Sequence, residues 1–160
     1  MLISTSRKPS QKTRKFCKNF AHATGSSSIN RGKMNMREIL LKALYEEEVN
    51  LAIVNEIKGN PSRITFYSNE GELLLIMLIS INTTNDRLNI SPSKLKIVSE
   101  IKELNCLSDI LGFELVDKAD KNYIHITNGN ENSLGKINFI NKFGEKTDFQ
   151  INIKKIIDEL

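Results

Sequence analysis

Seven consecutive apolar residues, 73–79, lie near the middle of the 160-residue chain. The run falls well short of the roughly 20 apolar residues that a helix needs to span a bilayer. It has the length of a β-strand, and a strand that is apolar on both faces is typical of a sheet covered on both sides. The sequence therefore predicts a central strand over residues 73–81.

Helical and strand patterns alternate on both sides of this strand. Helices are predicted over residues 10–23 with Ser10 as N-cap, over 36–48 with Asn35 as N-cap, from Ser91-Pro92 to residue 104, and over 107–111. Strands are predicted at residues 2–4, 51–57, 64–67, 113–116, 123–127, 137–143 and 149–153, with a turn at 59–62. This order predicts an α/β protein of two similar α/β halves with mixed sheets, residues 1–88 and 89–160.

Basic residues are concentrated in the first quarter of the chain. Residues 1–42 contain ten Lys and Arg residues and the single acid Glu38, a net charge of +9, whereas the whole chain carries +4. Like charges packed this closely repel one another unless an anion relieves them, so the segment is typical of a surface that binds a polyanion. A solvated basic helix without a partner is the alternative interpretation.

The first predicted helix separates these charges from its apolar residues. At 100° per residue, Phe16 and Phe20 share one face, and Arg14, Lys15 and Lys18 lie on the opposite arc. A helix N-terminus favours an anion because its N–H groups are unpaired and its dipole is positive there. We therefore expect a backbone phosphate to bind at the start of this helix, where it would be held by Ser6, Arg7, Lys8, Ser10 and Lys12. The alternative is that these residues are simply exposed to solvent.

The sequence contains no pattern that indicates catalysis, a metal ion or a cofactor. The glycine spacing before Lys33 does not match a nucleotide-binding loop. His22 and His125 lie on separate predicted elements without clustered carboxylates, which argues against a metal site. Cys17 and His22 are about 140° apart around the helix, so they cannot form a nucleophilic pair.

The cysteines and the first residues bear on the cellular compartment. Cys17 and Cys106 are far apart and lack ligand spacing, so we expect both to be buried thiols in a reducing compartment. The apolar start of the chain is only three residues long before polar residues follow, which argues against a signal peptide. These features predict a cytoplasmic protein without a membrane partner.

Three stretches resemble one protein family. ISTSRKPSQKTRKFCK at residues 3–18 is similar to its opening strand, turn and basic helix. INRGKMNMREIL at 29–40 is similar to its Arg-Gly-Lys segment, and EIKGNPSRITFY at 56–67 to its Gly-Asn-Pro hairpin. In order and spacing the chain resembles the Brix-domain family of ribosome-biogenesis proteins, in the short archaeal form related to a protein subunit of the eukaryotic small-subunit processome.

The resemblance implies one Brix domain over residues 1–160, each half of which is similar to the anticodon-binding domain of class II aminoacyl-tRNA synthetases. It implies a non-catalytic protein that binds precursor ribosomal RNA during processing and subunit assembly, in the company of other ribosome-assembly proteins. The alternative is a scaffold whose basic face docks an acidic protein partner. Combined with the charge pattern, the resemblance predicts that the RNA-binding residues are Ser6, Arg7, Lys8, Ser10, Lys12, Arg14, Lys15, Lys18, Arg31, Lys33, Lys58, Asn60 and Arg63.

Overall fold

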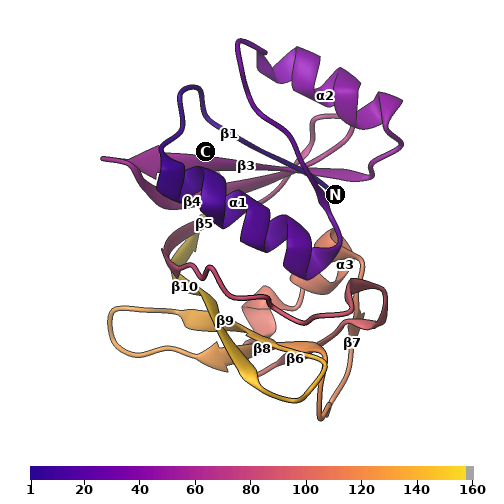
Figure 1. Cartoon of the computed structure of the whole chain (residues 1–160), viewed down its shortest axis with the longest axis vertical. Coiled ribbons are helices and arrows are strands. Elements are labelled where there is room, and N and C mark those ends of the chain that lie inside the picture. The colour runs from indigo at the N-terminus through magenta and orange to yellow at the C-terminus, as the bar shows by residue number, and fades with distance from the viewer. Residues whose placement is uncertain (158–160) are drawn as a thin grey trace.

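Helices and strands alternate along the protein, whose computed structural model describes residues 1–157 (Figure 1). The elements of the first half are β1 (Leu2–Thr5), α1 (Gln11–Thr24), β2 (Ser27–Ser28), α2 (Met36–Tyr45), β3 (Asn50–Ile57), β4 (Asn60–Ser68) and β5 (Leu73–Asn82). The second half contains the 3-10 turn η1 (Pro92–Lys94), β6 (Lys96–Ser99), the 3-10 turn η2 (Lys102–Leu104), α3 (Leu107–Leu111), β7 (Glu114–Leu115), β8 (Tyr123–Asn128), β9 (Gly135–Ile140) and β10 (Lys146–Ile157). No helix within residues 1–157 is long and apolar enough to cross a membrane.

The ten strands form one mixed sheet in the order β2-β1-β3-β4-β5-β10-β9-β8-β6-β7. The α/β class predicted from the sequence is therefore confirmed. The predicted central strand is also confirmed, because β5 pairs with β4 on one side and with β10 on the other.

The same strand topology occurs twice in this sheet. In the first half β1 pairs in parallel with β2 and β3, and the antiparallel strands β4 and β5 follow. In the second half β6 pairs in parallel with β7 and β8, and the antiparallel strands β9 and β10 follow. α1 connects the parallel pair β1 and β2, and η2 with α3 connects the corresponding pair β6 and β7.

The two sets of strands are joined through β5 and β10, which run antiparallel. The sequence predicts a mixed sheet for each half, but the hydrogen bonds between these two strands merge them into one. Met77 and Ile79 of β5 and Ile151 and Ile153 of β10 are all buried. The joint therefore lies in the protein core and is no edge contact.

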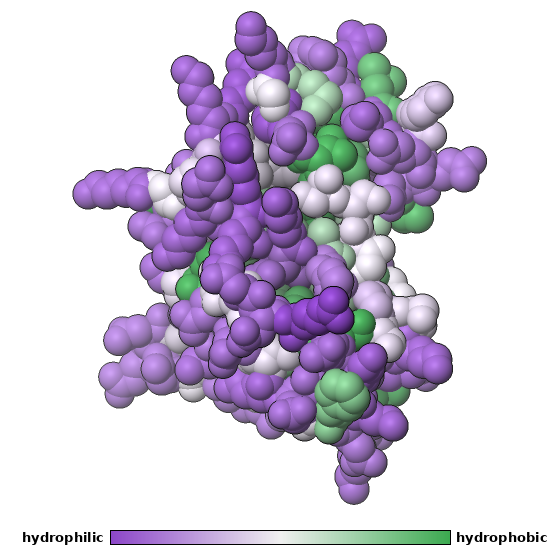
Figure 2. Space-filling model, viewed as in Figure 1, coloured by the Kyte–Doolittle hydropathy of each residue, from purple (hydrophilic) through white to green (hydrophobic). Residues whose placement is uncertain are grey.

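One large apolar core lies on the face of the sheet that α1 covers, here called the inner face. It includes side chains of both halves. The ring of Phe149 on β10 is 5.8 Å from that of Phe16 on α1 and 4.7 Å from that of Phe139 on β9. α1 therefore packs against the second half as well as its own, and its polar side faces outward in the middle of the view in Figures 1 and 2.

The opposite, outer face of the sheet is covered in the first half by α2. Ile39 and Ala43 of this helix pack on Leu2, Leu51 and Ile53 in a second, smaller core. β1 and the first five residues of β3 are thus covered on both faces, which agrees with their burial.

The predicted helix from Ser91 to residue 104 is wrong. Only the 3-10 turns η1 and η2 are helical there, and β6 lies between them, paired in parallel with β8. Leu95, Ile97 and Ile101 are buried. The helix was predicted from the three-residue spacing of Leu95, Val98, Ile101 and Leu104. The buried Leu95 and Ile97 instead alternate with partly exposed neighbours, as in a strand that pairs with β8.

Helix caps, a hairpin turn and the two cysteines were also predicted from local sequence. Ser10 and Asn35 are the N-caps of α1 and α2, as predicted. The turn predicted at 59–62 is tighter and lies at residues 58–59, because β4 already begins at Asn60. Cys106 is exposed, which corrects the expectation of a buried thiol; Cys17 is buried as expected. The short strand β2 was not predicted, since Ser27 and Ser28 carry no strand pattern.

Replacing Phe149 with alanine tests the core that joins the two halves. The F149A variant leaves a cavity between α1 and β9, and we expect it to lose about 3–5 kcal/mol of unfolding free energy in urea denaturation. The matched control is F143A, because Phe143 is 63% exposed. It should lose no more than about 0.5 kcal/mol, and equal losses in the two variants would contradict this account of the core.

Candidate nucleic-acid interface

The start of α1 is fixed by its capping residue. The Ser10 hydroxyl accepts a hydrogen bond from the Thr13 amide at 3.2 Å, which satisfies one of the unpaired N–H groups of the first turn. Before it, Lys8 has a positive φ of 54°, so the chain turns sharply between β1 and the helix. The first turn of α1 contains no acidic residue. Its positive end therefore has only polar and basic neighbours on its own helix.

Glu56 at the end of β3 holds this helix start in place. Its carboxylate accepts hydrogen bonds from the Ser10 amide at 3.0 Å and from the Thr13 hydroxyl. The bond from Thr13 and then the bond from the Ser10 amide stabilise the charged form and lower the pKa of Glu56 below its ordinary value. This acid next to the basic segment is thus held by neutral donors.

The β3–β4 hairpin contributes the next part of the surface. Lys58 and Gly59 form its two-residue turn with φ angles of 51° and 79°, the left-handed pair that such hairpins require. The Ser10 hydroxyl donates to the Gly59 carbonyl at 2.7 Å, and Lys12 Nζ donates to Asn60 Oδ1 at 2.9 Å. Two segments that are about 50 residues apart in the sequence therefore meet at the start of α1.

A third segment, the loop between β2 and α2, brings Arg31 to the same side of the molecule. Its Nη1 donates to the Thr5 carbonyl at 2.9 Å and its Nε to the Met34 carbonyl at 2.7 Å. Burial and the nearby positive charge of Arg7 lower the pKa of Arg31, although an arginine stays protonated near neutral pH. Arg7 and Arg31 are thus held close together, and a bound anion would relieve the repulsion between their positive charges.

α1 and the segment 28–32 enclose a hollow of about 520 Å³, which we call the basic pocket. Its charged walls are Arg14, Lys15 and Lys18 of α1 and Arg31 of the loop, and no carboxylate lines it. Figure 2 shows hydrophilic side chains over the outward side of α1. The basic pocket has the charge and the width to hold a phosphate group of a nucleic-acid backbone.

The predicted site residues fall into three places. Arg14, Lys15, Lys18 and Arg31 line the basic pocket, with Arg7 and Lys33 beside it, since Arg7 Nη2 donates to the Lys33 carbonyl at 3.4 Å. Ser10, Lys12, Lys58 and Asn60 meet at the start of α1, and Ser6 and Lys8 lie in the loop before it. The third place holds Arg63.

The structure does not bring Arg63 to this surface. Its neighbour Ile64 belongs to the core on the inner face, and successive residues of a strand point to opposite faces, so Arg63 lies on the outer face. Its Nε is buried without a hydrogen-bond partner among the described residues. A structural role in β4 is the simpler account of this residue.

The predicted basic residues share one electrostatic property. Within residues 1–157, the ion pairs are Met1–Glu48, Lys42–Glu46, Lys96–Glu114 and His125–Glu100. None of them involves a predicted site residue. Basic side chains that only support a fold are commonly paired when they cluster, so this unpaired group is suited to an external anion.

Some residues at the basic pocket were not predicted. Gln11, Asn30 and Asn85 contribute amide groups to its walls. Gln11 and Asn30 lie beside predicted residues, so the charge pattern could have indicated them. Asn85 belongs to the connection between the halves, and no local signal marks it, because it reaches the pocket through the packing of distant segments.

A thiol also lines the basic pocket. Burial raises the pKa of Cys17 to about 12, so it stays protonated near neutral pH. Within residues 1–157 no group of three or more His, Cys, Asp or Glu side chains could hold a metal ion.

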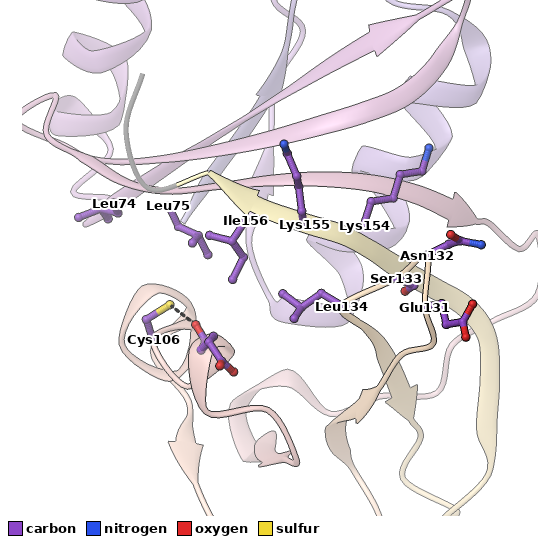
Figure 3. A pocket seen from close by; sticks show the side chains of 11 residues that line it. Leu74, Leu75, Cys106, Glu131, Asn132, Ser133, Leu134, Lys154, Lys155 and Ile156 are labelled. Carbon is purple, nitrogen blue, oxygen red and sulfur yellow. Dashed lines mark hydrogen bonds between the residues drawn. The ribbon is translucent and has the colours of Figure 1, made fainter.

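A second hollow, of about 620 Å³, lies elsewhere on the molecule (Figure 3). It is lined by apolar side chains such as Leu74 and Leu134 and by charges of both signs, Glu131 and Lys154 among them. Cys106 lies at its side and its thiol donates weakly to the Glu103 carbonyl at 3.7 Å. None of the predicted site residues lines it, and its mixed charge sets it apart from the basic pocket.

Archaeal proteins that share one name are similar to part of this sequence. No family model matches the chain. A "Probable Brix domain-containing ribosomal biogenesis protein" of Methanosarcina mazei is 44% identical over 80 residues, which are 50% of this chain and 49% of that protein. A protein of the same name in Methanothermobacter thermautotrophicus is 46% identical over 71 residues, 44% of this chain and 43% of that one. The chain thus matches about half the length of these curated relatives.

Two solved structures resemble the whole protein. The crystal structure of Mil, an archaeal Imp4-like protein, has a TM-score of 0.86 and 26% sequence identity and covers 98% of both chains. A ribosomal biogenesis protein of Aeropyrum pernix has a TM-score of 0.72 and 20% identity over 99% of this chain and 97% of that one. The second likeness concerns the fold alone.

Replacing Glu56 with glutamine tests how the start of α1 is held. Because the pKa of Glu56 is lowered in the folded protein, its contribution is complete above the unfolded pKa and is lost as the pH falls through the folded value. E56Q should lose about 1 kcal/mol or less at neutral pH, since the carboxylate is only partly shielded from water.

The measurement is urea denaturation at several pH values between about 7 and about 3. The difference between the natural protein and E56Q should shrink as the pH falls. The control is E70Q, since Glu70 is exposed. A difference that is constant over the whole pH range would show that the Glu56 carboxylate does not act through its charge.

Proposed function

We propose that the chain is a Brix-domain protein of ribosome biogenesis that binds precursor ribosomal RNA during processing and subunit assembly, which its similarity to the archaeal proteins of that name and to Mil supports. The proposal places the contact on the basic pocket and on the start of α1. The protein would act by binding, without catalysis and without a cofactor. Other ribosome-assembly proteins would be its partners, and the cytoplasm its location.

The convergence of unpaired cations is the observation that carries this proposal. Arg14, Lys15, Lys18 and Arg31 come from two segments and line one pocket without a carboxylate. A phosphate in the basic pocket would gain charge-assisted hydrogen bonds from arginine and lysine and would relieve the repulsion between Arg7 and Arg31. Regularly spaced phosphates of an RNA strand could then continue toward the start of α1.

The remaining candidate residues would contact the RNA at other positions. Lys12, Lys58 and Asn60 would bind a neighbouring phosphate. Ser6, Lys8 and Ser10 lie in the adjoining loop, and Arg7 and Lys33 lie at the margin of the pocket. Ser10 is also the helix cap, so its replacement would disturb the fold as well as binding. Arg63 is assigned least weight, because it lies on the other face of the sheet.

The proposal extends to the domain organisation. We treat residues 1–160 as one Brix domain with halves 1–88 and 89–160, each of which would share its fold with the anticodon-binding domain of class II aminoacyl-tRNA synthetases. The repeated strand order supports the division. A domain of that kind binds RNA through its surface, which is compatible with a protein without a catalytic cluster.

Charge reversal at the basic pocket tests the proposal. The R14E/K15E variant should bind a precursor ribosomal RNA fragment about tenfold or more weakly than the natural protein in fluorescence anisotropy, because fewer neutralised phosphates mean less counterion release. Binding should weaken with added salt, and the slope of log K against log salt should be shallower in the variant. RNA should be preferred over duplex DNA of equal length.

The matched control is K94E/K102E, which makes the same change of charge at exposed positions outside the basic pocket. It should bind nearly as well as the natural protein. If instead RNA binding is absent, or R14E/K15E binds like the control, the RNA assignment fails. Pull-down of an acidic protein that RNA fragments do not displace would then favour the scaffold interpretation of the same surface.

A further inference from the structure

The two halves share a strand topology, but they differ in how the outer face of the sheet is covered. In the first half the connection from β2 to β3 contains α2, which packs on that face. In the second half the corresponding connection, from β7 to β8, spans only residues 116–122 and contains no helix. Among the described elements, no helix therefore takes the place of α2 over β6 and β8, the counterparts of β1 and β3.

Polar side chains occupy this uncovered face. Ile124, Ile126, Ile137 and Phe139 belong to the core on the inner face. Because side chains alternate along a strand, their neighbours point outward. These are Tyr123, His125 and Thr127 on β8, and Lys136, Asn138 and the apolar Ile140 on β9. A sheet face that is covered by a helix is apolar. The polar side chains on this face therefore indicate contact with water or with a polar ligand.

The face is hollowed, with a volume of about 450 Å³. His125, Thr127, Asn130, Lys136 and Lys146 are among the residues that line the hollow, and no carboxylate is. Its floor is rigid, because Asn138 donates to the His125 carbonyl at 3.1 Å and to the Thr127 hydroxyl at 3.2 Å and accepts from Gln150 at 2.6 Å. The space is sufficient for one nucleobase or more with adjoining sugar.

Two rings lie next to each other on β8. The ring centroids of Tyr123 and His125 are 5.8 Å apart with an interplanar angle of 50°, and both residues are partly exposed. His125 Nε2 is 3.6 Å from a carboxylate oxygen of Glu100, which orients the imidazole ring. Flat rings that stand out from the open face of a sheet are a common platform for unpaired bases.

The charges of the face complement a phosphate chain. Lys136 and Lys146 are exposed and form no ion pair among residues 1–157. Glu100 and Glu114 lie toward β6 and are paired with His125 and Lys96. Asp148 on β10 is exposed two residues after Lys146, but it does not line the hollow, so the charges that line the hollow are positive.

We propose that this outer face of the second half is a binding site for single-stranded RNA, separate from the basic pocket. Unpaired bases stack on Tyr123 and His125, and the adjoining phosphates contact Lys136 and Lys146. An added protein strand is a poorer occupant, because β8, β9 and β10 are each paired on both sides. The polar lining likewise argues against an apolar helix. The inference rests on the proposed function, since it gives an RNA-binding protein a second, base-directed surface.

The test uses the full chain and a fluorescent uridine oligonucleotide of about ten nucleotides, a length typical of single-strand sites on one domain. The K136E/K146E variant should bind it about fivefold or more weakly than the natural protein. The slope of log K against log salt should be shallower by about 0.7 for each phosphate that is no longer neutralised. The control K94E/K102E changes the same charge in the same half outside the hollow, and it should bind within about twofold of the natural protein.

Tyr123 gives a second, independent variant pair. Y123L should weaken binding about fivefold or more, as expected when one base no longer stacks on an aromatic ring, whereas Y123F keeps the ring and should bind like the natural protein. Equal binding by Y123L and Y123F, or by K136E/K146E and its control, would overturn the inference. Circular dichroism of each variant verifies that the fold is intact.

The experiment distinguishes this inference from the proposed function. If R14E/K15E loses binding and K136E/K146E does not, the second surface is refuted while the basic pocket stands. If K136E/K146E loses the oligonucleotide while R14E/K15E binds every RNA normally, the second surface stands without the first. A protein that binds neither RNA refutes both.

Discussion

Phe149 lies between Phe16 of α1 and Phe139 of β9, beside the strand pair in which β5 joins β10. This contact holds α1 against both halves of the sheet at once. Because the apolar side of α1 is fixed in this way, its basic side must face outward across the molecule. The positions of Arg14, Lys15 and Lys18 therefore follow from an apolar contact on the other side of the same helix.

The polar contacts at the start of α1 refine this arrangement. Glu56 accepts from Ser10 and Thr13, so this acid beside the start of α1 is held by neutral donors and leaves the lysines and arginines free for an anion. Had Glu56 paired with Lys12 or Arg14, the surface would have less positive charge. Its placement thus stabilises the helix start and preserves the attraction for an anion.

Much of this protein follows from local sequence, and the remainder depends on contacts between distant segments. Ser10 and Asn35 as caps and residues 73–81 as a central strand could be predicted, because each depends on neighbours in the chain. β6 could not, since Leu95, Val98, Ile101 and Leu104 have the three-residue spacing of a helix, and only the pairing with β8 makes the segment a strand. The contribution of Asn85 to the pocket and the position of Arg63 could not be predicted either, because they depend on which segments and faces meet after folding.

The strand order has a consequence for synthesis of the protein. β5 is complete by residue 82, yet its partner on one side is β10, which begins at residue 146. A chain that emerges from the ribosome in order must leave the edge of β5, and the part of α1 that packs on Phe149, without their partner until β10 appears. A protein of this topology is therefore exposed to wrong strand pairing during much of its own translation, and the docking of β10 acts as the closing step of folding.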